Sequence, residues 1–313
     1  MIASGSAVTP SRAALVAAFA AVYLIWGSTY LVMKLATASM PPLLMAGTRY
    51  ALAGALLYVL VRWRGEPRPT RRGWGPALVI GFCLLAVGNG GTTLGVQYLP
   101  SGLTALLVAT VPMFLAVLGW ASGITARPTG RVAVGLTLGL LGMGLLAAHP
   151  SAAGVARPGH PAVGVAVVLT AALLWAVGSL YSKNHQPAPS PFLSGAMQML
   201  CGGAMMLAAG LLRGEATGFA LAQVTIKSWV AFSYLVTIGS IVAFTAYIWL
   251  LRVVEPALAG TYAFVNPVVA LLLGWAFAGE TLNLTMLGGA ALTVVAVGLV
   301  VLGGRRESAT PTS

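Results

Sequence analysis

The chain has 313 residues, of which 58% are hydrophobic and only 7% charged, and its formal net charge is +12. So apolar a composition cannot cover a water-facing surface, which excludes a soluble globular protein and places the chain in a lipid bilayer. Most of the basic residues fall at the ends of apolar segments, in the short connections between them or in the tails, so the folded basic surface that nucleic-acid binding needs is excluded as well.

Ten apolar segments follow one another along the chain, each close to the roughly 20 residues that a membrane-spanning helix needs. Short breaks marked by polar residues, Pro or Gly separate them. We therefore expect an all-α integral membrane protein with ten transmembrane helices. Their ranges are 13–35, 42–61, 75–97, 101–122, 131–148, 162–182, 191–212, 229–251, 257–278 and 284–303.

The first of these segments contains a phrase that returns in the sixth. "WGSTYLVMK" occupies residues 26–34, and "WAVGSLYSK" occupies residues 175–183, which lie 149 positions further along the chain. At the same separation, residues 41–66 align without a gap with residues 190–215. The chain is therefore predicted to be a five-helix unit that has been duplicated.

Five helices per copy make the second copy enter the membrane from the side opposite to the first. We expect two inverted repeats around a central cavity, at residues 13–148 and 162–303, with residues 1–12 and 304–313 as tails. Inverted repeats are typical of secondary transporters, where they build the binding site near the middle of the bilayer. A membrane channel or an integral membrane enzyme is the alternative.

The basic residues indicate which connections face the cytoplasm. Twelve Lys and Arg residues lie in one set of alternating connections, whereas three lie in the other, namely Arg157, Arg213 and Lys227. Because cytoplasmic connections carry the excess of positive charge, we expect both termini and their tails in the cytoplasm.

Motifs for nucleotide, metal or cofactor chemistry are missing from the sequence. None of the three lysines follows the glycine pattern of a P-loop, so no ATPase domain or ATPase subunit is expected. Aspartate is absent, and the five glutamates lie at helix ends, in connections or in the tail, which leaves no acidic cluster for a metal. We expect no cofactor, no metal, and as partners a small-molecule substrate and the lipid bilayer. The oligomeric state stays open.

Polar and aromatic side chains recur at helical spacing on several expected helices. In contact with lipid such groups are costly, so they should face inward and either line a transport path or bond one helix to another. Lys34 has the further alternative of snorkelling to the membrane surface. The candidates for substrate binding are Trp26, Tyr30, Lys34, Asn89, Thr93, Gln97, Trp175, Ser179, Ser240, Phe244, Tyr247, Tyr262 and Asn266.

Two prolines and one arginine complete the candidate site. Pro112 and Pro267 match in the two copies, near the middle of the fourth and ninth expected helices. Paired interruptions of this kind point to a binding site in a repeat transporter, although a kink needed only for packing explains them as well. Arg49 lies about 10 Å into the second helix, where a charge costs roughly 2.5–3.5 kcal/mol. We expect Arg49 to bind carbonyls or substrate inside the bundle, or else to snorkel.

Three segments of the sequence resemble a known family. "YLIWGSTYLVMKLATASMPPLLMAGTRYALAG" at 23–54, "GNGGTTLGVQYLPSGLTALLVATVPMF" at 88–114 and "LLRVVEPALAGTYAFVNPVVALLLGWAFAGE" at 250–280 are similar to EamA-type exporters of the drug/metabolite transporter superfamily. The resemblance extends over almost the whole chain. It implies ten helices, an inner-membrane location, export of small metabolites or amphipathic compounds, and a cavity lined mainly by the first, third and fourth helices of each repeat.

The chain departs from one pattern of that superfamily. The small four-helix multidrug transporters rely on an intramembrane glutamate to exchange protons for cationic drugs, whereas no glutamate here lies near the middle of an expected helix. We therefore expect alternating-access export of neutral or zwitterionic metabolites, such as amino acids, or of amphipathic compounds. The solute would move down its own gradient or in exchange for another, and multidrug efflux is the alternative within transport.

Overall fold

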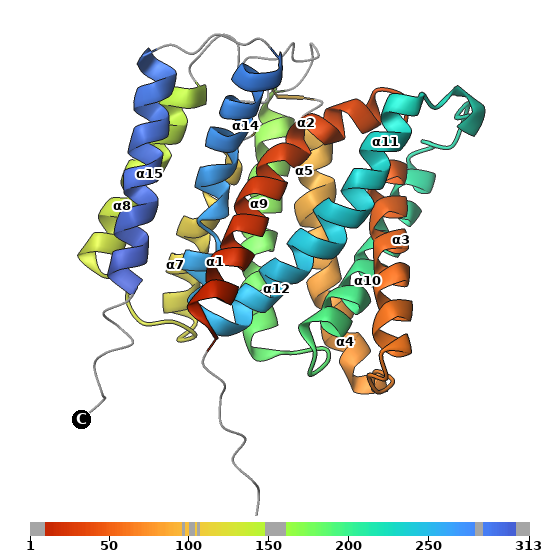
Figure 1. Ribbon diagram of the computed structural model, residues 1–313, viewed down its shortest axis with the longest axis horizontal. Helices are drawn as coiled ribbons and strands as arrows, with labels where there is room; N and C mark the ends of the chain where they lie inside the picture. The colour runs from red at the N-terminus through yellow and green to blue at the C-terminus, as the bar shows by residue number, and fades with distance from the viewer. Residues whose placement is uncertain are drawn as a thin grey trace, which may run out of the picture.

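The computed structural model describes residues 10–95, 98, 99, 104, 107–147, 161–278 and 284–304, and every regular element in those residues is a helix (Figure 1). The predicted all-α class is confirmed. The helices of the first repeat are α1 (Arg12–Ala20), η1 (Ala21–Ile25), α2 (Trp26–Thr37), α3 (Pro42–Trp63), α4 (Arg71–Ile80), η2 (Gly81–Asn89), α5 (Gly90–Gly95), α7 (Val111–Ala121) and α8 (Gly130–Ala147). Those of the second repeat are α9 (Pro161–Asn184), α10 (Pro191–Leu212), η4 (Leu221–Gln223), α11 (Ile226–Tyr234), η5 (Leu235–Val242), α12 (Ala243–Val253), α13 (Pro256–Ala259), α14 (Tyr262–Ala278) and α15 (Leu284–Gly304).

The length and composition of these helices suit a bilayer. Within the described residues, six continuous helical runs are long and apolar enough to cross a membrane, and three shorter apolar helices accompany them. The protein is therefore a multi-pass membrane protein. The count of ten crossings stays a prediction, because the expected fourth helix at 101–122 lies partly outside the described residues.

Local sequence explains where several helices begin. Proline occupies the first position of both α3 and α10, where its missing N–H costs nothing because that N–H would have no partner within the helix. The hydroxyl of Thr70 caps α4 by accepting a hydrogen bond from the Gly73 N–H, and Thr225 caps α11 in the same way through the Ser228 N–H. These caps place the helix starts in the polar connections.

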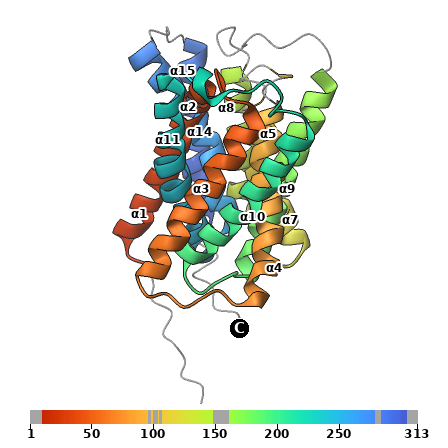
Figure 2. The same cartoon turned by 90° about the vertical axis from the view of Figure 1, so that its right-hand side faces the viewer.

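Counterpart helices of the two repeats pack against each other. The second helices of the repeats, α3 and α10, contact each other closely, with Gly47 against Leu207 and Gly54 against Leu200. Since the residue numbers rise along one helix as they fall along the other, the pair is antiparallel. The fifth helices, α8 and α15, form a second such pair. Figure 1 shows the two pairs on opposite sides of the bundle, and Figure 2 shows α3 and α10 from their own side.

A carboxylate marks the inverted arrangement of α3 and α10. Glu215, just beyond the end of α10, accepts hydrogen bonds from the Leu43 and Leu44 N–H groups at 2.8 and 3.0 Å. A negative charge is favourable at a helix N-terminus. The end of α10 therefore meets the start of α3, which places residues 64–66 and 213–215 at opposite ends of the pair. The start of α1 and the end of α15 lie together at the lower end in Figure 1.

Three π-helical segments interrupt the α-helices near the centre of the bundle. η2 and η5 lie at corresponding places, in the third helix of each repeat, whereas η1 lies in the first helix and its counterpart α9 continues without interruption. A π-helix bonds each N–H to the carbonyl five residues before it, and such segments are rare and concentrate at functional sites. The two repeats thus differ in their first helix.

The close contact of α3 and α10 predicts how two glycine substitutions differ. A Cβ at Gly203 would lie 2.5 Å from the Ala51 nitrogen, so we expect Gly203→Ala to destabilise the bundle by about 1–3 kcal/mol. Gly144 has open space around its Cα, so Gly144→Ala should be neutral or gain up to about 1 kcal/mol from better helix propensity. Thermal unfolding of the detergent-solubilised variants measures both effects, and equal melting temperatures would contradict the packing described.

Candidate functional site

A cavity lies between the two repeats, near the middle of the bundle. Its volume is about 70 Å³, below the roughly 300–1,000 Å³ of sites that enclose small molecules. The cavity is therefore narrow in this structure, and a metabolite can enter only if helices move apart. The lining includes Trp26, Thr29, Met33, Arg49, Tyr50, Asn89 and Thr92 from the first repeat and Trp175, Tyr262 and Asn266 from the second.

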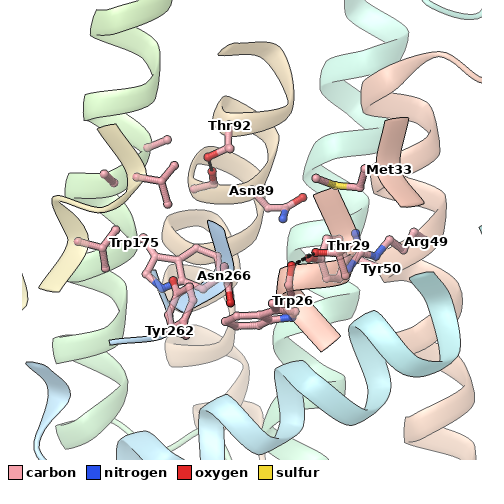
Figure 3. Close-up of a pocket in the computed structure, with 15 residues that line it drawn as sticks. Trp26, Thr29, Met33, Arg49, Tyr50, Asn89, Thr92, Trp175, Tyr262 and Asn266 are labelled. Atoms are coloured by element: carbon pink, nitrogen blue, oxygen red, sulfur yellow. Dashed lines mark hydrogen bonds between the residues drawn. The ribbon is translucent and has the colours of Figure 1, made fainter. Parts of the chain in front are cut away.

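Two tryptophans from the repeated phrase meet at the edge of this cavity. Trp26 and Trp175, which are counterparts at the separation of 149, have ring centroids 5.7 Å apart and an edge-to-face angle of 80°. Both are 8% exposed. Because each belongs to the first helix of its repeat, their contact joins the two halves at equivalent points. Figure 3 shows Asn89, Thr92 and Met33 above Trp26 and Tyr262.

Two tyrosines extend the tryptophan contact into an aromatic cluster of Trp26, Trp175, Tyr247 and Tyr262. All six ring pairs have centroids between 4.8 and 6.3 Å apart, and each such pair contributes about 0.5–1.5 kcal/mol beyond its buried area. The Tyr247 hydroxyl accepts a hydrogen bond from Trp175 Nε1 at 3.0 Å and bonds to the Ser179 hydroxyl at 2.8 Å. The four rings fill the space next to the cavity.

Neighbouring backbone positions hold the tryptophans in place. Trp26 Nε1 donates a hydrogen bond to the Gly239 carbonyl in the π segment η5 at 3.1 Å. Trp175 packs closely against η2 at Gly88, where a Cβ would come within 2.8 Å of the indole ring. The π segments η2 and η5 therefore both contact the aromatic cluster directly.

Arg49 is buried inside the bundle, with only 2% of its surface exposed. Its Nε donates a hydrogen bond to the Ser240 hydroxyl at 2.7 Å, and Ser240 in turn donates to the Leu235 carbonyl. The guanidinium carbon lies 4.7 Å from the centre of the Tyr50 ring. The side chain extends from α3 toward Thr29 and the cavity (Figure 3). The sequence predicted that Arg49 either turns into the bundle or snorkels to the membrane surface, and in the structure it turns into the bundle.

The two prolines interrupt their helices in different ways. Pro267 lies inside α14, directly after the cavity-lining Asn266. In the orientation that satisfies its amide, Asn266 donates to the carbonyls of Tyr262 at 3.1 Å and Tyr23 at 3.3 Å. Pro112 lies in the first turn of α7 instead of mid-helix, because the chain makes a turn at residues 109 and 110 before α7 begins.

The structure brings six of the predicted site residues together around the cavity, namely Trp26, Arg49, Asn89, Trp175, Tyr262 and Asn266. Other predicted residues are buried without lining it, namely Thr93, Ser179, Ser240, Phe244 and Tyr247. Thr93 bonds to the Asn89 carbonyl. Gln97 lies outside the described residues, as do the side chains of Tyr30 and Lys34.

Sequence reasoning missed several of the residues that line the cavity. The candidates on the third helix were Asn89, Thr93 and Gln97, whereas Asn89 and Thr92 line the cavity. Thr92 and Thr93 lie three and four residues after Asn89, so both share its helix face, and the spacing alone does not tell which of them reaches the cavity. Thr29, Met33 and Tyr50 gave no separate signal.

Lys183 makes an ion pair away from the cavity. Its ammonium lies 3.6 Å from the Glu255 carboxylate, and both side chains are partly exposed at the end of the bundle. Exposed pairs of this kind contribute at most about 1 kcal/mol. The pair joins α9 to the connection before α13, below the aromatic cluster.

Comparison with known proteins places the chain in a family. Residues 12–148 and 162–302 match the model of the EamA-like transporter family. The chain is 40% identical to the uncharacterized inner membrane transporter YedA of Escherichia coli, over 90% of this chain and 89% of the relative. It is 29% identical to the uncharacterized transporter YvbV of Bacillus subtilis, over 93% and 92% of the two chains.

Two further comparisons bear on function and fold. A probable amino-acid metabolite efflux pump of Salmonella typhimurium is 26% identical over 91% of this chain and 93% of its own length. A solved crystal structure matches with a TM-score of 0.76 over 96% of this chain and 100% of that chain, at 19% identity, which shows likeness of fold alone. Because the family model matches both repeats, the chain belongs to the EamA-like transporter family.

Proposed function

We propose that the protein is a secondary transporter that exports small neutral or zwitterionic metabolites across the inner membrane by alternating access. The observation that carries this proposal is the position of the cavity. Residues of both repeats line it, and Trp26 and Trp175, the counterpart tryptophans of the two repeats, contact each other at its wall. Relatives described as probable amino-acid metabolite efflux pumps support export of such compounds.

Counterpart residues at the two ends of the bundle support alternating access. Met33 and Arg49 line the cavity, whereas their counterparts Ser182 and Gln198 are buried toward the opposite end. Within the described residues, the Ser182 hydroxyl and both polar atoms of the Gln198 side chain have no hydrogen-bond partner. A buried polar group without a partner costs about 1–3 kcal/mol. A second conformation that opens this side to water would remove that cost.

We further propose that the cavity belongs to the outward-facing side. The excess of basic residues favours cytoplasmic termini, and Thr29 and Met33 lie beyond Trp26 in the direction away from the N-terminus. In this orientation the aromatic cluster and the ion pair of Lys183 with Glu255 seal the cytoplasmic side. Movement of the solute down its own gradient, or in exchange, is part of the proposal.

Metabolite profiling of cells tests the proposed export. Expression of the protein should lower the cytosolic level, and raise the level in the medium, of at least one small zwitterionic metabolite. Trp26→Ala should abolish the difference because it opens the seal between the halves and removes a wall of the cavity. Trp63→Ala is the matched control, since Trp63 is 84% exposed at the end of α3. Unchanged profiles for the parent protein, at equal amounts in the membrane, would contradict export.

Removal of one hydroxyl tests the seal itself. Tyr247→Phe leaves the rings in contact but removes the hydrogen-bond acceptor of the buried Trp175 N–H. We therefore expect the free energy of unfolding to fall by about 1–3 kcal/mol. Tyr234→Phe is the control, because the Ser28 hydroxyl that bonds to Tyr234 also donates to the Ile25 carbonyl and so keeps a partner. Thermal unfolding in detergent measures both variants. A Tyr247→Phe protein that melts no lower than the control would show that the hydroxyl does not hold the seal.

A further inference from the structure

Arg49 carries a charge that the described part of the chain does not neutralise. No carboxylate among the described residues lies within ion-pair distance of its guanidinium, since the ion pair found there joins Lys183 to Glu255. Glu215 binds the N-terminus of α3 instead. A buried charge without a partner is strongly unfavourable, and intramembrane charges generally mark the path of a substrate or ion.

The hydrogen-bonding groups of Arg49 are used only in part. A guanidinium has five N–H donors, and the described residues accept a hydrogen bond from Nε alone, through Ser240. The terminal nitrogens therefore remain available to a ligand in the cavity that Arg49 lines. Gly239 makes room for them, since a Cβ there would lie 3.1 Å from Nη2.

Arg252 shows how an arginine with a structural role finds hydrogen-bond acceptors in this chain. Its terminal nitrogens donate hydrogen bonds to the carbonyls of Ala188, Pro189 and Ser190 and to the Ser194 hydroxyl. It thereby ties α12 to the connection before α10. Arg49 has no comparable set of carbonyls among the described residues, so a purely structural role explains its single bond to Ser240 and leaves its remaining donors unexplained.

An acceptor lies in the same cavity. Asn89 lines it, and its side-chain oxygen is buried and has no hydrogen-bond partner within the described residues. An ammonium group on the substrate would supply the missing donor. The faces of Trp26 and Tyr262 border the same space, and aromatic faces attract cations and accommodate apolar groups.

We infer that Arg49 and Asn89 determine which metabolites the cavity accepts: Arg49 binds the carboxylate of an α-amino acid, or of a compound with the same pair of groups, and Asn89 binds its ammonium group. This inference rests on the proposed function, because it names the class of substrate for that cavity. A planar guanidinium fits a carboxylate through two parallel hydrogen bonds. The substrate's negative charge neutralises Arg49, and cations without a carboxylate are repelled by it.

Transport in proteoliposomes tests this inference. Liposomes are loaded with the twenty common amino acids, their carboxamides and the amines that lack the carboxyl group, at about pH 6, where carboxylates are ionised and amines protonated. Efflux is followed by mass spectrometry against protein-free liposomes. We expect at least one amino acid to leave through the protein, and its carboxamide and amine to leave about tenfold more slowly or not at all, because hydrogen bonds to a charged group are lost.

Variants at position 49 test whether Arg49 causes the preference for amino acids over their carboxamides and amines. Arg49→Gln introduces the residue of its counterpart Gln198 and should reduce amino acid efflux at least about tenfold. Arg49→Lys keeps the charge and should retain part of the activity. Arg127→Gln is the control, because Arg127 lies over the Trp120 ring at the bundle surface.

The outcomes separate the two proposals. Efflux of amino acids and carboxamides at equal rates through the unmodified protein would leave transport standing and overturn the role of Arg49, whatever the variants do. Unchanged amino acid efflux in Arg49→Gln would overturn it as well. If none of the compounds moves through the unmodified protein, the proposed function fails and this inference fails with it.

Discussion

The hydrogen bond between Arg49 and Ser240 is the interaction on which the arrangement of the site depends. It holds a guanidinium inside the bundle at 2% exposure and joins the second helix of the first repeat to the π segment of the second repeat's third helix. In a bilayer interior, a charge of this kind persists only where it faces a partner, water or a substrate. The cavity exists beside Arg49 for that reason, and the polar side chains around it complete the same environment.

Duplication explains why the centre of the molecule is built from matching pairs. The antiparallel contact of α3 with α10 places the two copies in opposite directions, and Trp26 then meets Trp175, its own counterpart. The symmetry is broken at two places. The π segment η1 has no equivalent in α9, and Arg49 corresponds to Gln198. The cavity is lined by Met33 and Arg49 of the first repeat, whereas their counterparts Ser182 and Gln198 in the second repeat are buried.

The fold could be predicted from the sequence because hydrophobic length and the repeat separation of 149 residues report directly on bilayer thickness and internal symmetry. Trp26 and Trp175 could be predicted as central residues for the same reason. Arg49 was expected to turn inward or to snorkel on energetic grounds alone, and the structure shows the first.

The detailed lining could not be predicted in the same way. Thr92 and Thr93 both share the helix face of Asn89, so the spacing alone did not tell that Thr92 is the one that lines the cavity. Ser179 and Tyr247 carry polar groups, as predicted, but they bond to each other and seal the path instead of lining it. Whether polar side chains at helical spacing line a cavity or bond one helix to another depends on the conformation that the protein occupies. One sequence encodes every conformation of the transport cycle, so it does not distinguish the two roles.

Side-specific cysteine labelling tests the central claim most directly. In a protein with Cys83→Ala and Cys201→Ala, the counterparts Met33→Cys and Ser182→Cys are exposed to a membrane-impermeant maleimide from either side of oriented vesicles. The account predicts that the first reacts only from outside and the second only from the cytoplasmic side, and that a transported metabolite changes the two rates in opposite directions. Reaction of both positions from one common side would contradict an inverted pair of repeats that open alternately.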